Sequence, residues 1–472
     1  MSELWTLKEV VEATNGRLEG TPPATLGGVS IDSRSIAPGD IFVAIQGEHR
    51  DGHEFAAQAL IAGAGLAMVS RPDEAMKSKG ALLIVDEPLA ALRRLGMAAR
   101  ARTTAKIAAI TGSVGKTGTK EALRLALIPQ GETHASLASY NNHWGVPLSL
   151  ARMPRGARFA IFEIGMNHPG EITPLTRMVR PSVAVITTIA ASHLGHFRSM
   201  EDIADAKSEI FGGVEAGGSA VLNRDNAYYG RLEEAAKTAG IERIYSFGKD
   251  ASADCRLGSV VLHETCSCVT ASIFGEEIIY KLGAPGEHLV MNSLAVLAAA
   301  KLMGADLARS ALALAALSPP KGRGARLKVG APGGELTLID ESYNANPASV
   351  KAALAVLGNT RPAKGGRRIA VLGDMLELGE HSSALHADLA SAIDASGADA
   401  LYACGPLMRH LWDKIPAGRK GKYAPSSEEL KKLLMDDLKA GDVVMVKGSL
   451  GSRMGPLVEA IKERFAAAGG MA

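Results

Sequence analysis

The sequence has little that would direct it to a membrane, to secretion or to nucleic acid. No stretch reaches the ~18 uninterrupted apolar residues that a spanning helix needs, and the N-terminus MSELWTLKEVVEATNGRL has no apolar signal-peptide core. Charge is balanced, with 52 Lys and Arg against 50 Asp and Glu, so no bulk attraction to nucleic acid or anionic lipid arises. We therefore expect a cytoplasmic protein with no membrane span and no nucleic-acid partner.

Cysteine is also scarce, which argues against a disulfide framework or a zinc site. The chain has four cysteines, with one C-x-C pair, no second pair and no nearby histidine cluster at zinc spacing. We expect reduced, structural thiols at Cys255, Cys266, Cys268 and Cys404.

What the sequence does have is length and an alternating pattern. Domains of about 100–200 residues make three the central expectation for 472 residues. Residues 1–84 combine short strands and turns with helical stretches at 6–13 and 54–63, which is typical of a small α/β domain. Residues 85–317 alternate strand and helix, which predicts a doubly wound, mostly parallel sheet.

Two stretches interrupt that alternation. Residues 257–282 are rich in β-branched residues and predict an antiparallel subsheet, followed by helices at 291–303 and 307–317. SPPKGRG then looks like a linker, and strands and helices alternate again over 333–467. The expected fold is α/β in three domains, with a Rossmann-like third domain at 318–472 and a hinge near Ser318 to Gly324.

The stretch AAITGSVGKTGTKEAL resembles a phosphate-binding loop. In G-x-x-x-x-G-K-[ST], backbone N–H groups ring the phosphates, the lysine neutralises oxygens and the hydroxyl binds Mg²⁺. Gly115, Lys116 and Thr117 supply the second half, but Ile110 holds the first glycine's place, and Gly112 is the only upstream glycine. The alternative is a fortuitous turn with a surface lysine, but an apolar strand before the loop and a helix after it favour a nucleotide-binding central domain.

Two polar residues follow apolar strands of the same predicted sheet. Glu163 ends RFAIFEI and His193 follows SVAVITTI, so both could reach a cation beyond the sheet edge. A solvated strand-end acid and a capping or packed histidine are the alternatives. Lys207, on a probable helix, reads from the sequence alone as a solvent-facing charge.

Several motifs, in order, resemble the Mur ligases, ATP-dependent amide-bond-forming enzymes of peptidoglycan synthesis with three domains. They are TGSVGKT (111–117), EIGMNHPGEI (163–172), SHLGHF (192–197), DAKSEIF (205–211), GEHLVMNSLA (286–295) and VKGS (446–449). Residues 340–354 and 372–382 are similar to the member that joins D-alanyl-D-alanine to UDP-N-acetylmuramoyl tripeptide, and residues 30–55 are similar to the UDP-binding domains of that member and of the neighbour that adds the third residue. The D-N-P-R signature of the neighbour that adds the third residue is absent.

This resemblance implies the cofactors, the partners and part of the site. ATP and Mg²⁺ are the implied cofactors, UDP-N-acetylmuramoyl tripeptide and D-alanyl-D-alanine the partners, and a monomer the expected state. The loop residues Gly112, Ser113, Val114, Gly115, Lys116 and Thr117 would hold the phosphates, with Asn292 at adenine and Arg326 and Asp340 at phosphate and ribose. The implied metal ligands are Thr117, Glu163, His193 and a CO₂-carbamylated Lys207, and the implied catalytic residues are Lys116, His193 and Lys207. Leu289 stands where the family often has asparagine.

Other residues are candidates for substrate contact. Arg34, with Asp32 and Ser33, could bind uridine diphosphate, because arginine pairs with phosphate through two parallel hydrogen bonds. The alternative is that the DSR segment is simply a polar turn. Asn141 and Asn142 suit a sugar-peptide, or cap the segment before Pro147. Tyr343, Asn344 and Asn346 follow a strand of the third domain and could approach nucleotide and amine. In this scheme residues 1–84 bind the UDP substrate, 85–317 bind ATP, and 318–472 close on ATP and receive the amine.

Other functions stay open at this stage. Within the class, the chain could be a Mur-type ligase that adds a single amino acid, or a folate polyglutamate ligase. Outside the ligase class, the chain could be a nucleotide-gated binding protein without ligase activity, or a scaffold protein whose phosphate-binding loop is degenerate. The sequence does not assign the third residue of the tripeptide, the D-alanyl-D-alanine site, the modification of Lys207 or an open or closed arrangement.

Overall fold

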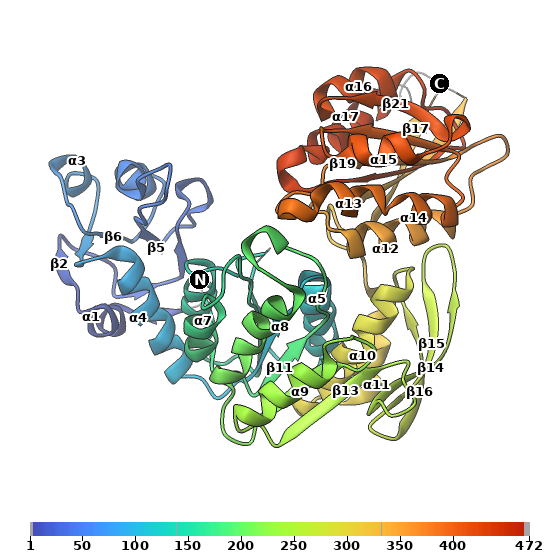
Figure 1. Cartoon of the computed structure of the whole chain (residues 1–472). Coiled ribbons are helices and arrows are strands. Elements are labelled where there is room, and N and C mark those ends of the chain that lie inside the picture. The colour runs from blue at the N-terminus through green and yellow to red at the C-terminus, as the bar shows by residue number, and fades with distance from the viewer. Residues whose placement is uncertain (1–2, 138, 332, 467–472) are drawn as a thin grey trace.

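The chain folds into three α/β units that follow one another in space (Figure 1). The computed structural model describes residues 3–137, 139–331 and 333–466, with side chains to residue 464. In the view of Figure 1, the C-terminal unit lies above the central unit at the upper right, and the N-terminal unit lies to the left of the central unit. An α/β fold with mainly parallel sheets was expected, and it is confirmed.

The N-terminal unit is built on a five-stranded sheet of order β2-β7-β6-β5-β4 beside the short pair β1-β3. A capping box between Thr6 and Glu9 starts helix α1, close to the predicted helical stretch. The elements are β1 (Trp5–Thr6), α1 (Leu7–Thr14), β2 (Arg17–Glu19), β3 (Thr25–Leu26), β4 (Gly28–Ser30), β5 (Asp40–Val43), α2 (Ala56–Ile61), β6 (Leu66–Val69), α3 (Glu74–Lys77) and β7 (Leu82–Ile84).

Helix α4 (Pro88–Ala101) joins this unit to the next. Leu92 and Leu95 pack in one apolar core with Trp5 and with Leu148 of helix α6. The Trp5 indole N–H donates to the carbonyl of Ala151 at 2.8 Å. The N-terminal core therefore continues across α4 onto the central unit, and the proposed boundary at residue 84 stays a prediction.

The central unit has a nine-stranded sheet of order β16-β15-β14-β13-β12-β11-β8-β10-β9. Strands β8 to β13 run parallel, and β14, β15 and β16 pair antiparallel, which confirms the predicted subsheet. The elements are β8 (Lys106–Thr111), α5 (Lys116–Leu127), β9 (Thr133–Ala135), α6 (Gly145–Ala151), β10 (Phe159–Glu163), α7 (Ile172–Val179), β11 (Val183–Ile186), α8 (Met200–Ser208), β12 (Ser219–Asn223), α9 (Tyr229–Thr238), β13 (Arg243–Gly248), β14 (Cys255–Leu262), β15 (Ser267–Ile273), β16 (Glu276–Leu282), α10 (Glu287–Leu302) and α11 (Leu307–Ala313).

Alternating side chains of the central strands supply two cores. Ala108 and Ile110 of β8 pack with α5, α10 and α11, whereas Ile107 and Ala109 pack with helices α6 to α9. Helix α10 begins at Glu287, four residues before the predicted start, because Gly286 (φ 117°) ends the preceding turn. With both faces covered, the carboxyl ends of the parallel strands form the exposed edge where ligands bind in such sheets.

The C-terminal unit has a six-stranded sheet of order β17-β18-β22-β19-β20-β21, parallel except for β17. Helices α12, α14 and α15 pack on one face, and α16 and α17 pack on the other. The predicted elements leave out β17, which pairs antiparallel with β18 directly after the proline- and glycine-rich linker. The elements are β17 (Ala325–Ala331), β18 (Gly334–Glu341), α12 (Pro347–Gly358), β19 (Arg368–Gly373), α13 (Ser382–Ala387), α14 (Ala390–Ala395), β20 (Ala400–Cys404), α15 (Met408–Lys414), β21 (Lys420–Ala424), α16 (Ser427–Met435), β22 (Val443–Lys447) and α17 (Met454–Ala466).

The fold also bears on membrane spans and on the cysteines. None of the helices in the described ranges has the length and apolarity needed to cross a bilayer. The four cysteines are free thiols, as expected; Cys255 and Cys404 are buried, whereas Cys268 is exposed.

Candidate active site

A cleft of about 530 Å³ lies between the central and C-terminal units. Its lining comes from the loop before α5, the ends of β10 and β11, helix α10, the linker, and the loops after β18 and β19. We call the side formed by residues 113–118, Glu163 and Asn292 the phosphate wall, and the side formed by Arg323, residues 343–346 and Lys447 the C-terminal wall.

The phosphate wall depends on two glycines. Gly112 (φ 146°) lies so close to Thr187 that a Cβ would fall 2.0 Å from the Thr187 hydroxyl oxygen. Gly115 (φ 88°) lies against Asn292, where a Cβ would fall 2.7 Å from the amide nitrogen. A side chain at either position would push the loop out of shape, so Gly112 fills the place that the usual pattern gives to an earlier glycine.

Hydrogen bonds to the loop after β11 hold the segment between those glycines, among them one from the backbone N–H of Ser113 to the carbonyl of Thr188 at 2.8 Å. The backbone N–H of Ala190 donates to Ser113 Oγ at 3.0 Å, and Thr187 Oγ1 donates to the carbonyl of Val114 at 2.5 Å. Helix α5 starts from Gly115 with no side-chain cap. Its first N–H groups are therefore free of intrahelical partners and suit an anion, which the helix dipole also favours.

Lys116 stands at that helix start. Its Nζ donates to the carbonyl of Gly112 at 2.7 Å. Desolvation lowers the pKa of Lys116, and the Arg323 charge lowers it further, while Glu163 opposes the shift. A bound anion would offset the cost of burying the charged form of Lys116, so this side chain is suited to binding phosphate.

Glu163 and Thr117, predicted metal ligands, are in direct contact. The Thr117 hydroxyl donates to Glu163 Oε2 at 2.8 Å, and the Asn141 amide donates to Oε1 at 2.7 Å. Glu163 is only 1% exposed. Hydroxyl and carboxylate oxygens suit Mg²⁺, which keeps several waters and needs few protein ligands. Among the described residues, no group of three His, Cys, Asp or Glu side chains is placed to hold a metal ion.

His193 and Lys207 differ in how deeply their side chains are buried. His193 lines the cleft, with a left-handed backbone (φ 55°) and its Nδ1 atom 2.5 Å from Oε2 of Glu377. Lys207, on α8, is 1% exposed and is not among the cleft-lining residues. Burial and the Lys116 charge hold the pKa of Lys207 well below its usual value. The sequence-only reading of Lys207 as a solvent-facing charge is therefore wrong, because α8 turns this residue inward.

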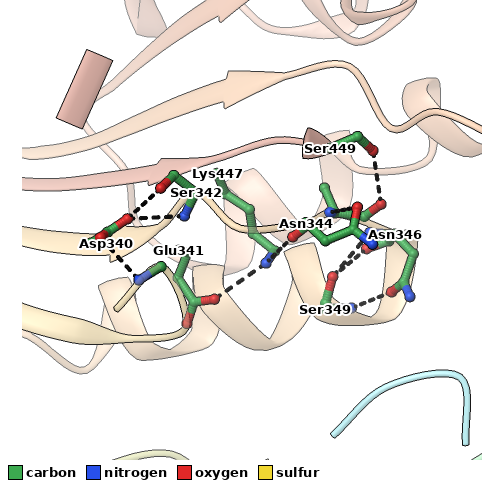
Figure 2. A network of polar contacts seen from close by, with 10 residues as sticks. Asp340, Glu341, Ser342, Asn344, Asn346, Ser349, Lys447 and Ser449 are labelled. Carbon is green, nitrogen blue, oxygen red and sulfur yellow. Dashed lines mark hydrogen bonds and ion pairs between the residues drawn. The ribbon is translucent and has the colours of Figure 1, made fainter. Parts of the chain in front are cut away.

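The C-terminal wall is a polar network at the ends of β18 and β22 (Figure 2). Lys447 Nζ donates to Glu341 Oε2 at 3.2 Å and to the carbonyl of Asn344 at 2.9 Å. Asn346 caps α12, its side chain accepting from the N–H of Ser349 at 2.9 Å (Figure 2). These bonds fix the loop that presents Tyr343 to the cleft.

Several predicted contacts lie away from the cleft lining. Asn142 accepts from the N–H of Gly145, the first residue of α6, at 2.9 Å, a local contact of the kind considered as its alternative role. Arg326 donates to Thr360 Oγ1 at 2.6 Å, outside the residues that line the cleft. Asp340 is buried and accepts from the N–H groups of Gly322 and Ser342, so it ties the linker to β18. Their ligand contacts stay predictions.

The predicted uridine-diphosphate residues belong to the N-terminal unit. Arg34 makes a two-pronged ion pair with Asp32, with contacts at 2.9 and 2.7 Å, and its side chain is 80% exposed. Asp32 also accepts from the backbone N–H of Arg34 at 3.0 Å. Hydrogen bonding to Arg34 lowers the pKa of Asp32 to about 2. Ser33 begins the short turn between them.

Arg323 is the clearest cleft residue that sequence reasoning missed. Its Nη2 donates to Ser139 Oγ at 3.1 Å, and its guanidinium carbon lies 4.0 Å from the centroid of the Tyr343 ring. Lys447, His288 and Glu377 also line the cleft. The signals for Arg323 and Lys447 were present in SPPKGRG and VKGS, where a basic residue stands next to glycine, in the linker and at the end of a strand respectively.

A glycine loop of the nucleotide-phosphate type, opposed by a second sheet edge across a cleft, defines a nucleotide-binding α/β protein. The chain belongs to the Mur ligase family. The Mur ligase middle domain matches residues 110–300, the Mur ligase glutamate ligase domain matches 325–450, and the Mur ligase family catalytic domain matches 25–110.

Relatives match over nearly the whole length. UDP-N-acetylmuramoyl-tripeptide--D-alanyl-D-alanine ligase of Rickettsia prowazekii is 33% identical over 91% of this chain and 94% of its own length. The ligase of the same name from Escherichia coli is 32% identical over 97% and 98%. The crystal structure of MurF from Acinetobacter baumannii superposes with a TM-score of 0.84 at 30% identity, covering 97% of this chain and 99% of that one. MurF of Thermotoga maritima, solved with ADP, gives 0.76 at 25% identity, covering 93% and 98%.

Proposed function

We propose that this chain is an ATP-dependent ligase that forms an amide bond between UDP-N-acetylmuramoyl tripeptide and D-alanyl-D-alanine in peptidoglycan synthesis. One observation carries the chemistry: Lys116, Thr117 and Glu163 meet at an uncapped helix start that faces a second polar wall across one cleft. The named relatives, matched over nearly the full chain, support the choice of substrates.

The reaction needs activation of a carboxylate, because oxide is a very poor leaving group. Transfer of the ATP γ-phosphoryl onto the tripeptide carboxylate makes an acyl phosphate and releases ADP. The amine of D-alanyl-D-alanine then attacks the acyl carbon, and phosphate leaves as the amide forms. Positioning and charge neutralisation are the main tasks that this leaves to the protein.

Lys116 and the first N–H groups of α5 would offset charge on the phosphates. Thr117 and Glu163 would hold Mg²⁺, which would neutralise charge on the phosphates. Asn292 lies against the phosphate loop, a place from which it can reach the nucleotide. Closure of the C-terminal unit about the linker at 318–324 would exclude water from the acyl phosphate.

Lys207 is suited to carbamylation. Carbon dioxide reacts with a neutral amine, and burial beside Lys116 favours the neutral form of Lys207. The resulting carbamate would replace a buried amine with an anionic oxygen donor, which with Glu163 and His193 would form the proposed second metal site.

Substrate contacts complete the proposal. Arg34, with Asp32 and Ser33, would receive uridine diphosphate, and Asn141 and Asn142 the sugar-peptide. Tyr343, Asn344 and Asn346 would approach the nucleotide and the amine, and Arg326 and Asp340 would reach the nucleotide on closure. ATP and UDP-linked precursors are cytoplasmic compounds, so we place the protein in the cytoplasm, and we propose a monomer because one chain supplies both cleft walls.

The test is ADP formation by the purified chain. With ATP, Mg²⁺ and UDP-N-acetylmuramoyl tripeptide, adding D-alanyl-D-alanine should start turnover, whereas single amino acids should not. Turnover with a single amino acid would favour another Mur-type ligase. ATP hydrolysis indifferent to both substrates would favour a nucleotide-gated binding protein instead.

A further inference from the structure

Two short loops from different units meet beside the cleft. One, after β11, contains a 3₁₀ turn at Leu194–His196, and the other, after β19, leads into a 3₁₀ turn at Gly379–His381. The backbone N–H of Gly195 donates to the carbonyl of Glu377 at 2.8 Å. This bond links the central and C-terminal units directly, at a place separate in sequence from the linker.

The contact requires glycine on both sides. A Cβ on Gly195 would fall 3.0 Å from the backbone nitrogen of Gly379, and a Cβ on Gly379 would fall 2.9 Å from Cα of Gly195. Gly379 also has φ 61°, whereas Gly195 has no such restriction. A methyl group at Gly195 would therefore act as a wedge between the units without straining its own backbone.

The same loops bring a carboxylate to an imidazole. Oε2 of Glu377 lies 2.5 Å from Nδ1 of His193, and both residues have the left-handed backbone that is uncommon outside glycine. Nδ1 is buried and has no hydrogen-bond partner other than this close carboxylate. A proton held on Nδ1 leaves the lone pair on Nε2, the form in which histidine binds a metal.

We infer that Glu377 is a positioning residue that couples docking of the C-terminal unit to the metal site of the central unit. The catch, as we call it, consists of the backbone bond from Gly195 to Glu377 and the contact of the Glu377 carboxylate with His193. Both parts hold the units together, and the carboxylate also sets the His193 tautomer. Because such coupling is reciprocal, metal binding at His193 favours the docked arrangement. The inference rests on the proposed function, since it takes His193 as a metal ligand.

The experiment compares Glu377→Gln and Gly195→Ala with the control Glu380→Gln in the full chain. Glu380 is 90% exposed and adjoins the catch without contacting His193. Small-angle X-ray scattering reports docking, and electron paramagnetic resonance with Mn²⁺ alone reports metal affinity. Thermal melting by circular dichroism checks that each variant is folded.

Both catch variants should scatter as a more open molecule, and Glu377→Gln should weaken Mn²⁺ binding about tenfold, the lower end for lost outer-shell partners. In a His193→Ala background the Glu377→Gln effect on Mn²⁺ should vanish, because the pair acts as one unit. The control should match the wild type. Unchanged scattering in both catch variants, or no Mn²⁺ site that depends on His193, overturns the inference.

Failure of the proposed function looks different. In that case no variant, nor the wild type, forms ADP on addition of the two substrates, while the scattering differences between catch variants and control persist. If only the catch is wrong, the wild type is an active ligase and the variants dock as it does.

Discussion

The two walls of the cleft are built in different ways. The phosphate wall lies within the central unit: its main part is the loop between β8 and the start of α5, shaped by two glycines and an uncapped helix start, and Glu163 and Asn292 stand beside it. The C-terminal wall gathers Arg323 from the linker, residues 343–346 from the loop after β18, and Lys447 from the end of β22. The first wall is preformed within one unit, whereas the second faces the ligand only when two units dock. Catalysis should therefore be more sensitive to the first wall, and nucleotide affinity to the second.

The largest effect is expected at Lys116. In Lys116→Ala we expect kcat to fall about 10³-fold, the upper range for loss of one preorganised charge-stabilising group. The matched control is Lys106→Ala, at the exposed start of the strand that leads into the same loop. Coupled ADP assays measure both variants, and equal activity would mean that the phosphate wall is not where phosphoryl transfer occurs.

A second substitution tests Glu163, the carboxylate of the phosphate wall. Glu163→Gln keeps the shape that Thr117 and Asn141 contact but removes the charge, so kcat should fall about 10²-fold and the Mg²⁺ concentration needed for half-maximal rate should rise. Initial rates over a Mg²⁺ titration give both quantities. A wild-type Mg²⁺ dependence in this variant would contradict the metal role of Glu163.

On the C-terminal wall, Arg323→Ala should act on affinity. Loss of one charge-assisted contact costs about 1.5 kcal/mol, or roughly tenfold, so the KM for ATP should rise by that factor with a smaller change in kcat. Arg326→Ala is the informative partner, because Arg326 was the predicted nucleotide contact and here bonds Thr360 instead. Should Arg326→Ala raise the KM while Arg323→Ala does not, the docked arrangement of the linker during catalysis differs from this one.

The smallest effect is expected far from both walls. Arg34 is exposed and already paired with Asp32, so Arg34→Ala should raise the KM for the UDP substrate only about three- to fivefold, as expected for an exposed ion pair. The KM for ATP and kcat should stay unchanged. Steady-state kinetics with each substrate varied in turn separates these results, and a changed KM for ATP would place Arg34 in the wrong site.

The comparison also explains what could be predicted from the sequence. The phosphate loop, Glu163 and His193 could be predicted to lie at the cleft because the signal for each is local: a glycine pattern between strand and helix, or a polar residue at or just after a strand end. Lys207 needed the family resemblance, since one lysine on a helix carries no sign of which way it faces. Arg323, Lys447 and Glu377 were missed because their place in the cleft depends on how two units dock, which no local pattern reports. Strand β17 was missed because it follows a proline- and glycine-rich linker closely.

The most direct test of the central claim is the fate of the carboxylate oxygen. If the cleft transfers the γ-phosphoryl to the tripeptide carboxylate, tripeptide labelled with ¹⁸O in that carboxylate should deliver one labelled oxygen to each phosphate released with D-alanyl-D-alanine. Mass spectrometry of the phosphate reads this out, with unlabelled tripeptide in ¹⁸O water as the control. Phosphate that carries no label from the tripeptide, while amide still forms, would contradict activation through an acyl phosphate and the account built on it.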